Sequence, residues 1–230
     1  MNTLIMIPGM MCDERLFAPQ VAQFSGEWNI SIPVPKGYET VAGFANEILC
    51  DAPPKFALLG LSMGGIIAME VLRQAKGRVE RIALLDTNPL AEKDEVKQRR
   101  IPQMEAARNG KLREVLRDEM KPNYLADGPN KQDILVLCMD MAVDLGADVF
   151  LEQSKALRDR RDQSGTLKTT DIPALVLCGR EDALCPVERH ELMHELMPNS
   201  TLEIIDDAGH MPVLEQAEIT NSKIKTWLER

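Results

Sequence analysis

The sequence predicts an α/β fold with a mostly parallel sheet of about six strands flanked by helices. Up to about residue 87, short apolar runs of strand length alternate with segments of helical spacing, which is typical of a parallel sheet covered on both faces. From Asn88 to Gly165 this alternation stops, and only charged helical segments follow. Strands and helices then alternate again. We therefore expect one α/β core, residues 1–87 and 166–230, that carries a helical insertion, residues 88–165.

Each expected strand is a short apolar run closed by turn residues or by a polar side chain. Pro8 and Gly9 end the first run, and Pro33 and Pro35 close the second, because proline interrupts a strand ladder. Asp86 ends the fourth run. In chain order, the expected strands are Thr3–Ile7, Asn29–Val34, Phe56–Leu61, Val79–Leu85, Ala174–Cys178 and Leu202–Ile205.

The helices are expected where apolar residues recur every three or four positions. In the core, the expected helices are Leu16–Phe24, Thr40–Cys50, Gly64–Ala75, Pro186–Met197 and Leu214–Leu228. In the insertion they are Glu92–Arg108, Leu112–Met120, Gln132–Leu145 and Val149–Arg160, separated by Asn109-Gly110, Gly128-Pro129 and Gly146.

Length, composition and charge exclude several classes of protein. The chain has 230 residues, enough to bury the core of one domain, and its 44% hydrophobic content excludes a disordered chain. Its 36 acidic and 27 basic side chains give a net charge of -9, which disfavours a nucleic-acid partner because such a partner requires a basic face.

The N-terminus and the cysteines point to a cytoplasmic protein. The first residues carry no basic region, and Pro8 and Gly9 break their apolar run, so we predict neither a signal peptide nor a membrane-spanning segment. The five cysteines are scattered without the paired spacing of a metal site, and their odd number fits a reducing compartment. We expect no membrane partner.

The strongest local signal is Gly60-Leu61-Ser62-Met63-Gly64, a G-x-S-x-G sequence between an apolar strand and a helix. In this setting a tight turn lifts the serine hydroxyl clear of the sheet edge, and glycines allow the strand and helix backbones to approach closely. The positive end of the helix dipole also lies near the serine. The alternative is a glycine-rich turn with an idle serine. Because strand, turn and helix are all present, we predict a nucleophilic Ser62.

A nucleophilic serine needs a base within hydrogen-bond reach. The chain has three histidines. His210 lies in a loop just after the last expected strand, where a parallel sheet places its site, whereas His190 and His194 fall inside a helical segment. We therefore predict that His210 is the base.

The base in turn needs a carboxylate that holds it in the right tautomer and stabilises the imidazolium. Asp182 follows the fifth expected strand and is the candidate. Its neighbour Glu181 is a substitute, and Asp86, which ends the fourth strand, is the main rival.

A zinc site is the sharpest competing interpretation. His190-Glu191-Leu192-Met193-His194 is a literal H-E-x-x-H sequence, and Glu215 lies downstream as a third ligand. The same segment also fits a helix on the outside of the sheet, away from the strand ends. We therefore expect no metal and no other cofactor.

These residues resemble a known family, the α/β-hydrolase fold superfamily, and in particular its small cytoplasmic carboxylesterase-like members. The order Ser62, Asp182, His210 is the order of that superfamily. The resemblance extends almost from end to end and is carried by IMIPGMMCDERLF, FALLGLSMGGIIAMEVL, RIALLDTNP, IPALVLCGREDALCP and DDAGHMPVLEQ. It implies hydrolysis of a small-molecule carboxylic ester with a small to medium acyl group, through an acyl-enzyme, with the insertion as a helical cap.

The resemblance also implies an oxyanion hole made of backbone N–H groups. Its donors would be the amides of Met10 and Met63, with Met11 as the alternative if the turn is one residue longer. The chain departs from the family in two ways. It begins at what resembles the family's third strand, and it carries Pro8-Gly9 where family members often carry His-Gly.

The substrate pocket is the least determined feature. Met11, Met104, Met139 and Met211 are candidates to line it, although methionines at helical spacing more often pack between layers. Lactone, thioester and carbon–carbon bond hydrolysis use the same triad and stay open, as does a ligand sensor of the same fold. The acyl group, the leaving group and the oligomeric state do not follow from the sequence.

Overall fold

Six strands form one parallel sheet in the computed structural model, which describes residues 1–120 and 124–230. The order across the sheet is β2-β1-β3-β4-β5-β6, and each neighbouring pair is parallel. The strands are β1 (Asn2–Ile7), β2 (Trp28–Ser31), β3 (Phe56–Leu61), β4 (Val79–Leu85), β5 (Ala174–Gly179) and β6 (Ser200–Ile205). The predicted fold class is confirmed.

Burial explains why these segments are strands. Every residue of β3 and of β5 is buried, as expected for inner strands of a parallel sheet covered on both faces. The edge strand β2 is only partly buried and ends at Ser31, shorter than predicted. Pro33 and Pro35 follow it and lack the N–H groups that a longer ladder with β1 would need.

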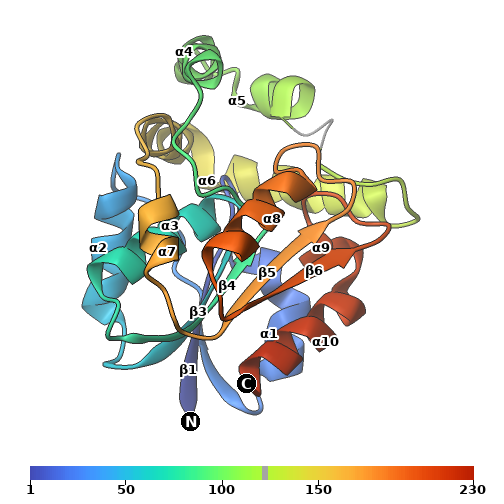
Figure 1. Ribbon diagram of the computed structural model, residues 1–230. Coiled ribbons are helices and arrows are strands. Elements are labelled where there is room, and N and C mark those ends of the chain that lie inside the picture. Colours follow the sequence, from blue (N-terminus) through green and yellow to red (C-terminus); the bar gives the residue numbers. More distant parts are fainter. Residues whose placement is uncertain (121–123) are drawn as a thin grey trace.

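Helices cover both faces of the sheet (Figure 1). In β1, Ile5 and Ile7 pack with helices α2 and α3, whereas Leu4 and Met6 belong to a second core that includes α1 and α10. The alternation follows from the two-residue period of a strand. The helices of the core are α1 (Ala18–Phe24), α2 (Val41–Asp51), α3 (Met63–Gln74), α8 (Val187–Leu196), α9 (Pro212–Glu215) and α10 (Ala217–Leu228), with one turn of 3-10 helix, η1 (Glu14–Phe17).

Between β4 and β5 the described residues contain helices and no strand. Figure 1 shows α4 and α5 beyond the ends of the strands, on the side toward which the strands run. Residues 121–123 of the predicted insertion lie outside the described part. The elements are α4 (Asp94–Arg108), α5 (Leu112–Glu114), a π-helical turn η2 (Val115–Met120), α6 (Lys131–Arg158) and α7 (Ser164–Lys168).

The last long helix of this segment is broken as its glycine predicts. Two helices were expected on either side of Gly146, and α6 runs over both with a kink there. Gly146 has φ 80°, a conformation that favours glycine because it has no Cβ. Among the described residues, no helix has both the length and the apolar character that crossing a bilayer requires.

Candidate active site

Ser62 occupies a strained turn between β3 and α3. Its φ of 55° is rare for a residue with a side chain, and such strain costs roughly 1–3 kcal/mol. Its N–H donates to the carbonyl of Leu85 at 2.8 Å, and the hydroxyl of Thr87 donates to the Ser62 carbonyl at 2.7 Å. Because Leu85 at the end of β4 and Thr87 in the loop after it hold the Ser62 backbone on both sides, the turn stays in a conformation that pushes the hydroxyl off the sheet edge.

The glycines of the G-x-S-x-G sequence are required by close backbone approach. A Cβ on Gly60 would lie 2.2 Å from the carbonyl oxygen of Gly64, and a Cβ on Gly64 would lie 1.9 Å from that of Ile7. Both contacts are with backbone, which cannot move aside as a flexible side chain could. Only glycine can therefore occupy these positions if the strand, the turn and the helix are to pack.

The three predicted residues Ser62, His210 and Asp182 lie in one hydrogen-bonded row. The Nε2 atom of His210 is 2.9 Å from the Oγ of Ser62, and its Nδ1 atom is 2.8 Å from Oδ2 of Asp182. His210 and Asp182 are both buried. Each side chain comes from a different loop at the carboxyl end of the sheet, so distant parts of the chain meet at one point.

The His210 loop is fixed by backbone and carboxylate contacts. The His210 N–H donates to the carbonyl of Tyr124 at 2.6 Å. The N–H groups on either side, of Gly209 and Met211, donate to the two carboxylate oxygens of Glu215 at 2.9 and 2.8 Å. Sequence reasoning considered Glu215 only as a metal ligand, and the structure instead gives it the role of a loop anchor.

Asp182 is held as a carboxylate. Its Oδ1 accepts the N–H groups of Leu184 and Cys185 at 2.8 and 3.0 Å, while its Oδ2 lies 2.8 Å from Nδ1 of His210. Burial alone raises the pKa of Asp182, but the imidazole and the two backbone donors outweigh it, so the pKa is lowered from its ordinary value. Asp182 is therefore charged at neutral pH.

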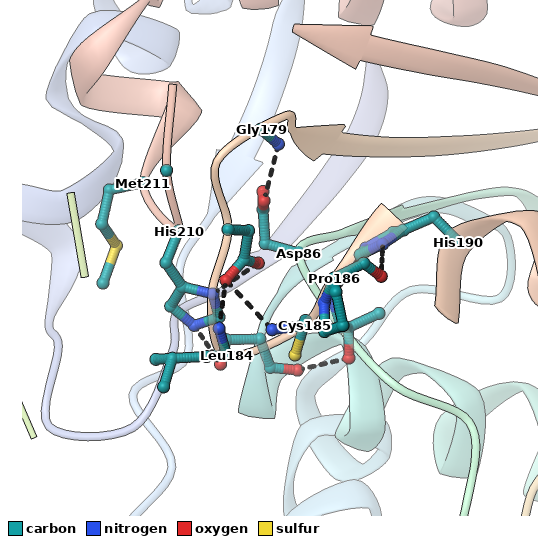
Figure 2. A network of polar contacts seen from close by, with 12 residues as sticks. Asp86, Gly179, Leu184, Cys185, Pro186, His190, His210 and Met211 are labelled. Atoms are coloured by element: carbon teal, nitrogen blue, oxygen red, sulfur yellow. Dashed lines mark hydrogen bonds and ion pairs between the residues drawn. The ribbon is translucent and has the colours of Figure 1, made fainter. Parts of the chain in front are cut away.

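Asp86, the rival acid, is in the opposite state. It is fully buried, and its Oδ1 accepts the N–H of Gly179 at 2.9 Å (Figure 2). Its Oδ2 has no hydrogen-bond donor among the described residues. Burial, followed by the negative charge of Asp182, raises the pKa of Asp86 well above its ordinary value. Burial and the neighbouring charge thus favour the protonated, neutral form of Asp86 over the carboxylate.

The H-E-x-x-H residues do not gather into a metal site. His190 is buried, with its Nε2 accepting the N–H of Thr87 at 3.1 Å, and burial lowers its pKa to about 4. His194 places Nδ1 2.7 Å from the hydroxyl of Ser200. Within residues 1–120 and 124–230, the His/Cys/Asp/Glu side chains close enough to share an ion are Asp182, Cys185 and His210, which include no member of the motif.

The N–H groups of Met10 and Met63, the two predicted oxyanion donors, face no acceptor among the described residues. Both residues line the cavity that contains Ser62. The amide of Met11, the alternative donor, is engaged, because it donates to Oε1 of Gln153 at 2.8 Å. Gln153 on α6 was not anticipated from the sequence, since a polar residue on a charged helix gives no sign of such a contact.

A cavity of about 240 Å³ opens above Ser62 and His210. Of the four methionines expected in it, Met211 lines the wall and Met11 does not. Met104 and Met139 line two other cavities, because the faces of α4 and α6 that carry them turn away from Ser62. The wall also contains charged residues that sequence reasoning missed, Glu92, Arg99, Arg100, Glu119 and Arg160.

Comparison with known proteins identifies the family. A family model described as the alpha/beta hydrolase family matches residues 13–222, most of the chain. The chain belongs to this family. It is a hydrolase, and the predicted resemblance is confirmed.

Relatives of this alpha/beta hydrolase are named as esterases. It is 24% identical over 232 residues to a pimeloyl-(acyl-carrier protein) methyl ester esterase from Legionella pneumophila (strain Paris), a match that covers 94% of this chain and 90% of the relative. A protein of the same name from Neisseria meningitidis (strain H44/76) is 22% identical over 244 residues, covering 97% and 92% of the two chains.

Solved structures of the same fold include two named hydrolases. A thermophilic esterase from Thermogutta terrifontis, solved with malate bound, superposes with a TM-score of 0.90 at 25% identity, covering 100% of this chain and 90% of that one. The enol-lactonase from Burkholderia xenovorans LB400 superposes with a TM-score of 0.87 at 21% identity, covering 100% and 92%. The second likeness shows the fold alone.

Proposed function

We propose that this hydrolase cleaves a carboxylic ester of a small to medium acyl group, with Ser62 as nucleophile, His210 as base and Asp182 as the orienting acid. The observation that carries the proposal is the row of hydrogen bonds from Ser62 Oγ through His210 to Asp182, at a strained turn that opens into a cavity. The esterase names of its relatives support the same reaction.

In the first half of the reaction, Ser62 is acylated. Its Oγ attacks the ester carbonyl carbon, and its proton passes to Nε2 of His210 across the 2.9 Å contact. The charge of Asp182 stabilises the imidazolium, while the amides of Met10 and Met63 stabilise the carbonyl oxygen as it becomes negative. The tetrahedral intermediate then loses the alcohol, which takes the proton from His210 and leaves the acyl group on Oγ.

In the second half, water replaces the alcohol. His210 removes a proton from a water molecule, whose oxygen attacks the acyl carbon. The intermediate collapses with release of the carboxylic acid, and Ser62 Oγ recovers its proton from His210. One ester and one water therefore give one acid and one alcohol, and no cofactor takes part.

The segment of residues 88–165 acts in this proposal as a cap that selects the substrate. It contributes Glu92, Arg100 and Arg160 to the cavity wall, whereas Ser62 and His210 come from the core. Replacing this segment by that of a related esterase should change the chain-length preference while Ser62 still reacts with a phosphonate. An unchanged preference would place selection in the core loops instead.

The methyl ester esterases among the relatives favour ester hydrolysis over lactone, thioester or carbon–carbon bond hydrolysis. We also propose a cytoplasmic location, on the ground that the five cysteines are odd in number and scattered without the paired spacing of a metal site. A small-molecule substrate is the proposed partner, and the acidic net charge of -9 argues against nucleic acid.

The test is turnover of p-nitrophenyl esters of increasing chain length, with lactones and thioesters beside them. A serine-directed phosphonate should label Ser62 alone, as seen by peptide mass spectrometry. Ser62→Ala, shown to be folded by circular dichroism, is the control. A protein that binds esters without turning them over would be a sensor, and the proposed enzymatic function would be wrong.

A further inference from the structure

Two arginines and one glutamate form a cluster in the wall of the cavity above Ser62. Arg100 Nη2 lies 2.9 Å from Glu92 Oε2, and Arg160 Nη1 and Nη2 each lie 3.1 Å from an oxygen of the same carboxylate. The side chains are largely buried, with 12% of Arg100, 7% of Arg160 and 8% of Glu92 exposed. Glu92 thus forms ion pairs with both arginines.

The cluster has a net charge of +1, because two arginines pair with one glutamate. Two guanidinium groups face one carboxylate in a place where burial makes an unpaired charge costly. The pKa of Arg160 reflects this excess. Burial and repulsion from Arg100 and Arg189 lower it despite the attraction of Glu92. The cavity wall also contains Arg99 and Glu119, which are both exposed. Their charges are opposite and offset each other, so they leave the excess positive charge of the cluster unchanged.

Arg100 has donors that the described residues leave unused. Its Nε is buried and has no hydrogen-bond partner in residues 1–120 and 124–230. Its Nη1 has only a weak acceptor, the sulfur of Met10 at 4.0 Å. Arg160 differs, because its Nε donates to the carbonyl of Leu90 at 3.0 Å. The free donors therefore belong to Arg100, next to the loop that carries the proposed oxyanion donor Met10.

We propose that Arg100 binds a carboxylate on the acyl side of the substrate, so that the enzyme hydrolyses esters of dicarboxylic acids that keep one free acid group. The inference rests on the proposed ester hydrolysis at Ser62. A carboxylate supplies one negative charge and strong acceptors, which match the single excess positive charge and the unused N–H groups. A neutral acyl chain would leave the positive charge without a counter-charge and the Arg100 N–H groups without an acceptor.

The experiment compares kcat/KM for monomethyl and dimethyl esters of the same diacids, from four to eight carbons, at low ionic strength and pH 7.5. We expect the monomethyl esters to be preferred at least tenfold at the best length, which corresponds to about 1.4 kcal/mol. In Arg100→Met, which keeps an apolar stem, the preference should fall below threefold, mainly through KM. Arg108→Met removes an exposed arginine from the same helix but outside this cavity, and should keep the preference.

Direct binding separates this inference from the proposed catalysis. Calorimetry with glutarate or adipate should show binding to the wild type that weakens at least tenfold in Arg100→Met and stays in Arg108→Met. Arg100→Lys, which keeps the charge, replaces the methionine variant if that variant is unfolded, and should retain part of the affinity. Equal use of mono- and dimethyl esters, or diacid binding that Arg100→Met leaves intact, would overturn the carboxylate site. Diacid binding without turnover of any ester would instead overturn the esterase proposal alone.

Discussion

Replacing Asp182 by asparagine tests the assignment of the acid most directly. The Oδ1 position of Asp182 accepts two N–H groups, from Leu184 and Cys185. In Asp182→Asn these two donors should hold the amide oxygen in the same place, so the amide NH₂ turns toward His210. Nδ1 of the imidazole must then accept, which puts the ring proton on Nε2, the atom that should take the proton from Ser62.

The structure also sets the size of the loss. Turning the amide over would restore the right tautomer but would leave two backbone N–H groups without an acceptor, at a cost of about 1–3 kcal/mol each. A total of about 2–6 kcal/mol corresponds to a loss of about 30-fold to 10⁴-fold in kcat. The missing negative charge on the acid adds to this loss, so we expect a value near the upper end.

Asp86→Asn is the matched control, because an amide imitates the neutral form that burial favours at this position. Its oxygen can still accept the Gly179 N–H and its NH₂ can still face Asp182. We expect a loss below tenfold. Initial rates with p-nitrophenyl acetate, together with thermal denaturation of both variants, measure the two effects. A larger loss in Asp86→Asn than in Asp182→Asn would refute the assignment and place the acid after β4.

Four further outcomes are expected. Ser62→Ala should lower ester hydrolysis by about 10⁴-fold or more in a folded protein, measured by initial rates, and near wild-type turnover would exclude the serine mechanism. Exhaustive dialysis against EDTA should leave activity unchanged, whereas stoichiometric zinc lost together with activity would contradict this. Gly64→Ala, whose Cβ would lie 1.9 Å from the carbonyl oxygen of Ile7, should destabilise the fold by about 3 kcal/mol or more, seen as a fall in Tm. Because the folded pKa of His190 is lowered to about 4, the unfolded chain binds a proton that the folded one does not between about pH 6.5 and 4. The free energy of unfolding should therefore decrease as the pH is lowered from about 6.5 to 4. In His190→Gln, denaturant titrations should show a smaller decrease over the same window.

The core of the fold was predictable because its signals are local. Each inner strand is a continuous apolar run, and the glycines around Ser62 mark a strand-to-helix turn that only glycine can form. Gly146 marked the kink in α6 for a similar reason, its φ of 80°. The short helix α7 was missed because five residues are too few to show a period.

The cavity wall was not predictable, because it depends on which face of a helix turns inward. Methionines were expected to line it, and two of the four candidates lie at other cavities instead. Arg100 and Arg160 resemble solvated surface residues in the sequence. Only the docking of α4 and α6 over the strand ends brings them to Glu92, and no local pattern encodes that contact.

The choice between Asp86 and Asp182 shows why residue type and strand position do not determine a role. Both are aspartates just after neighbouring parallel strands, so the sequence leaves them as rivals. The loop after β5 gives Asp182 two backbone N–H donors and an imidazole, whereas Asp86 receives one N–H and faces another carboxyl group. The negative charge of Asp182 raises the pKa of Asp86, and the carboxyl group with fewer donors is the one that favours its protonated form. The surroundings therefore favour the protonated form at Asp86 and the carboxylate form at Asp182, which is the one that faces His210.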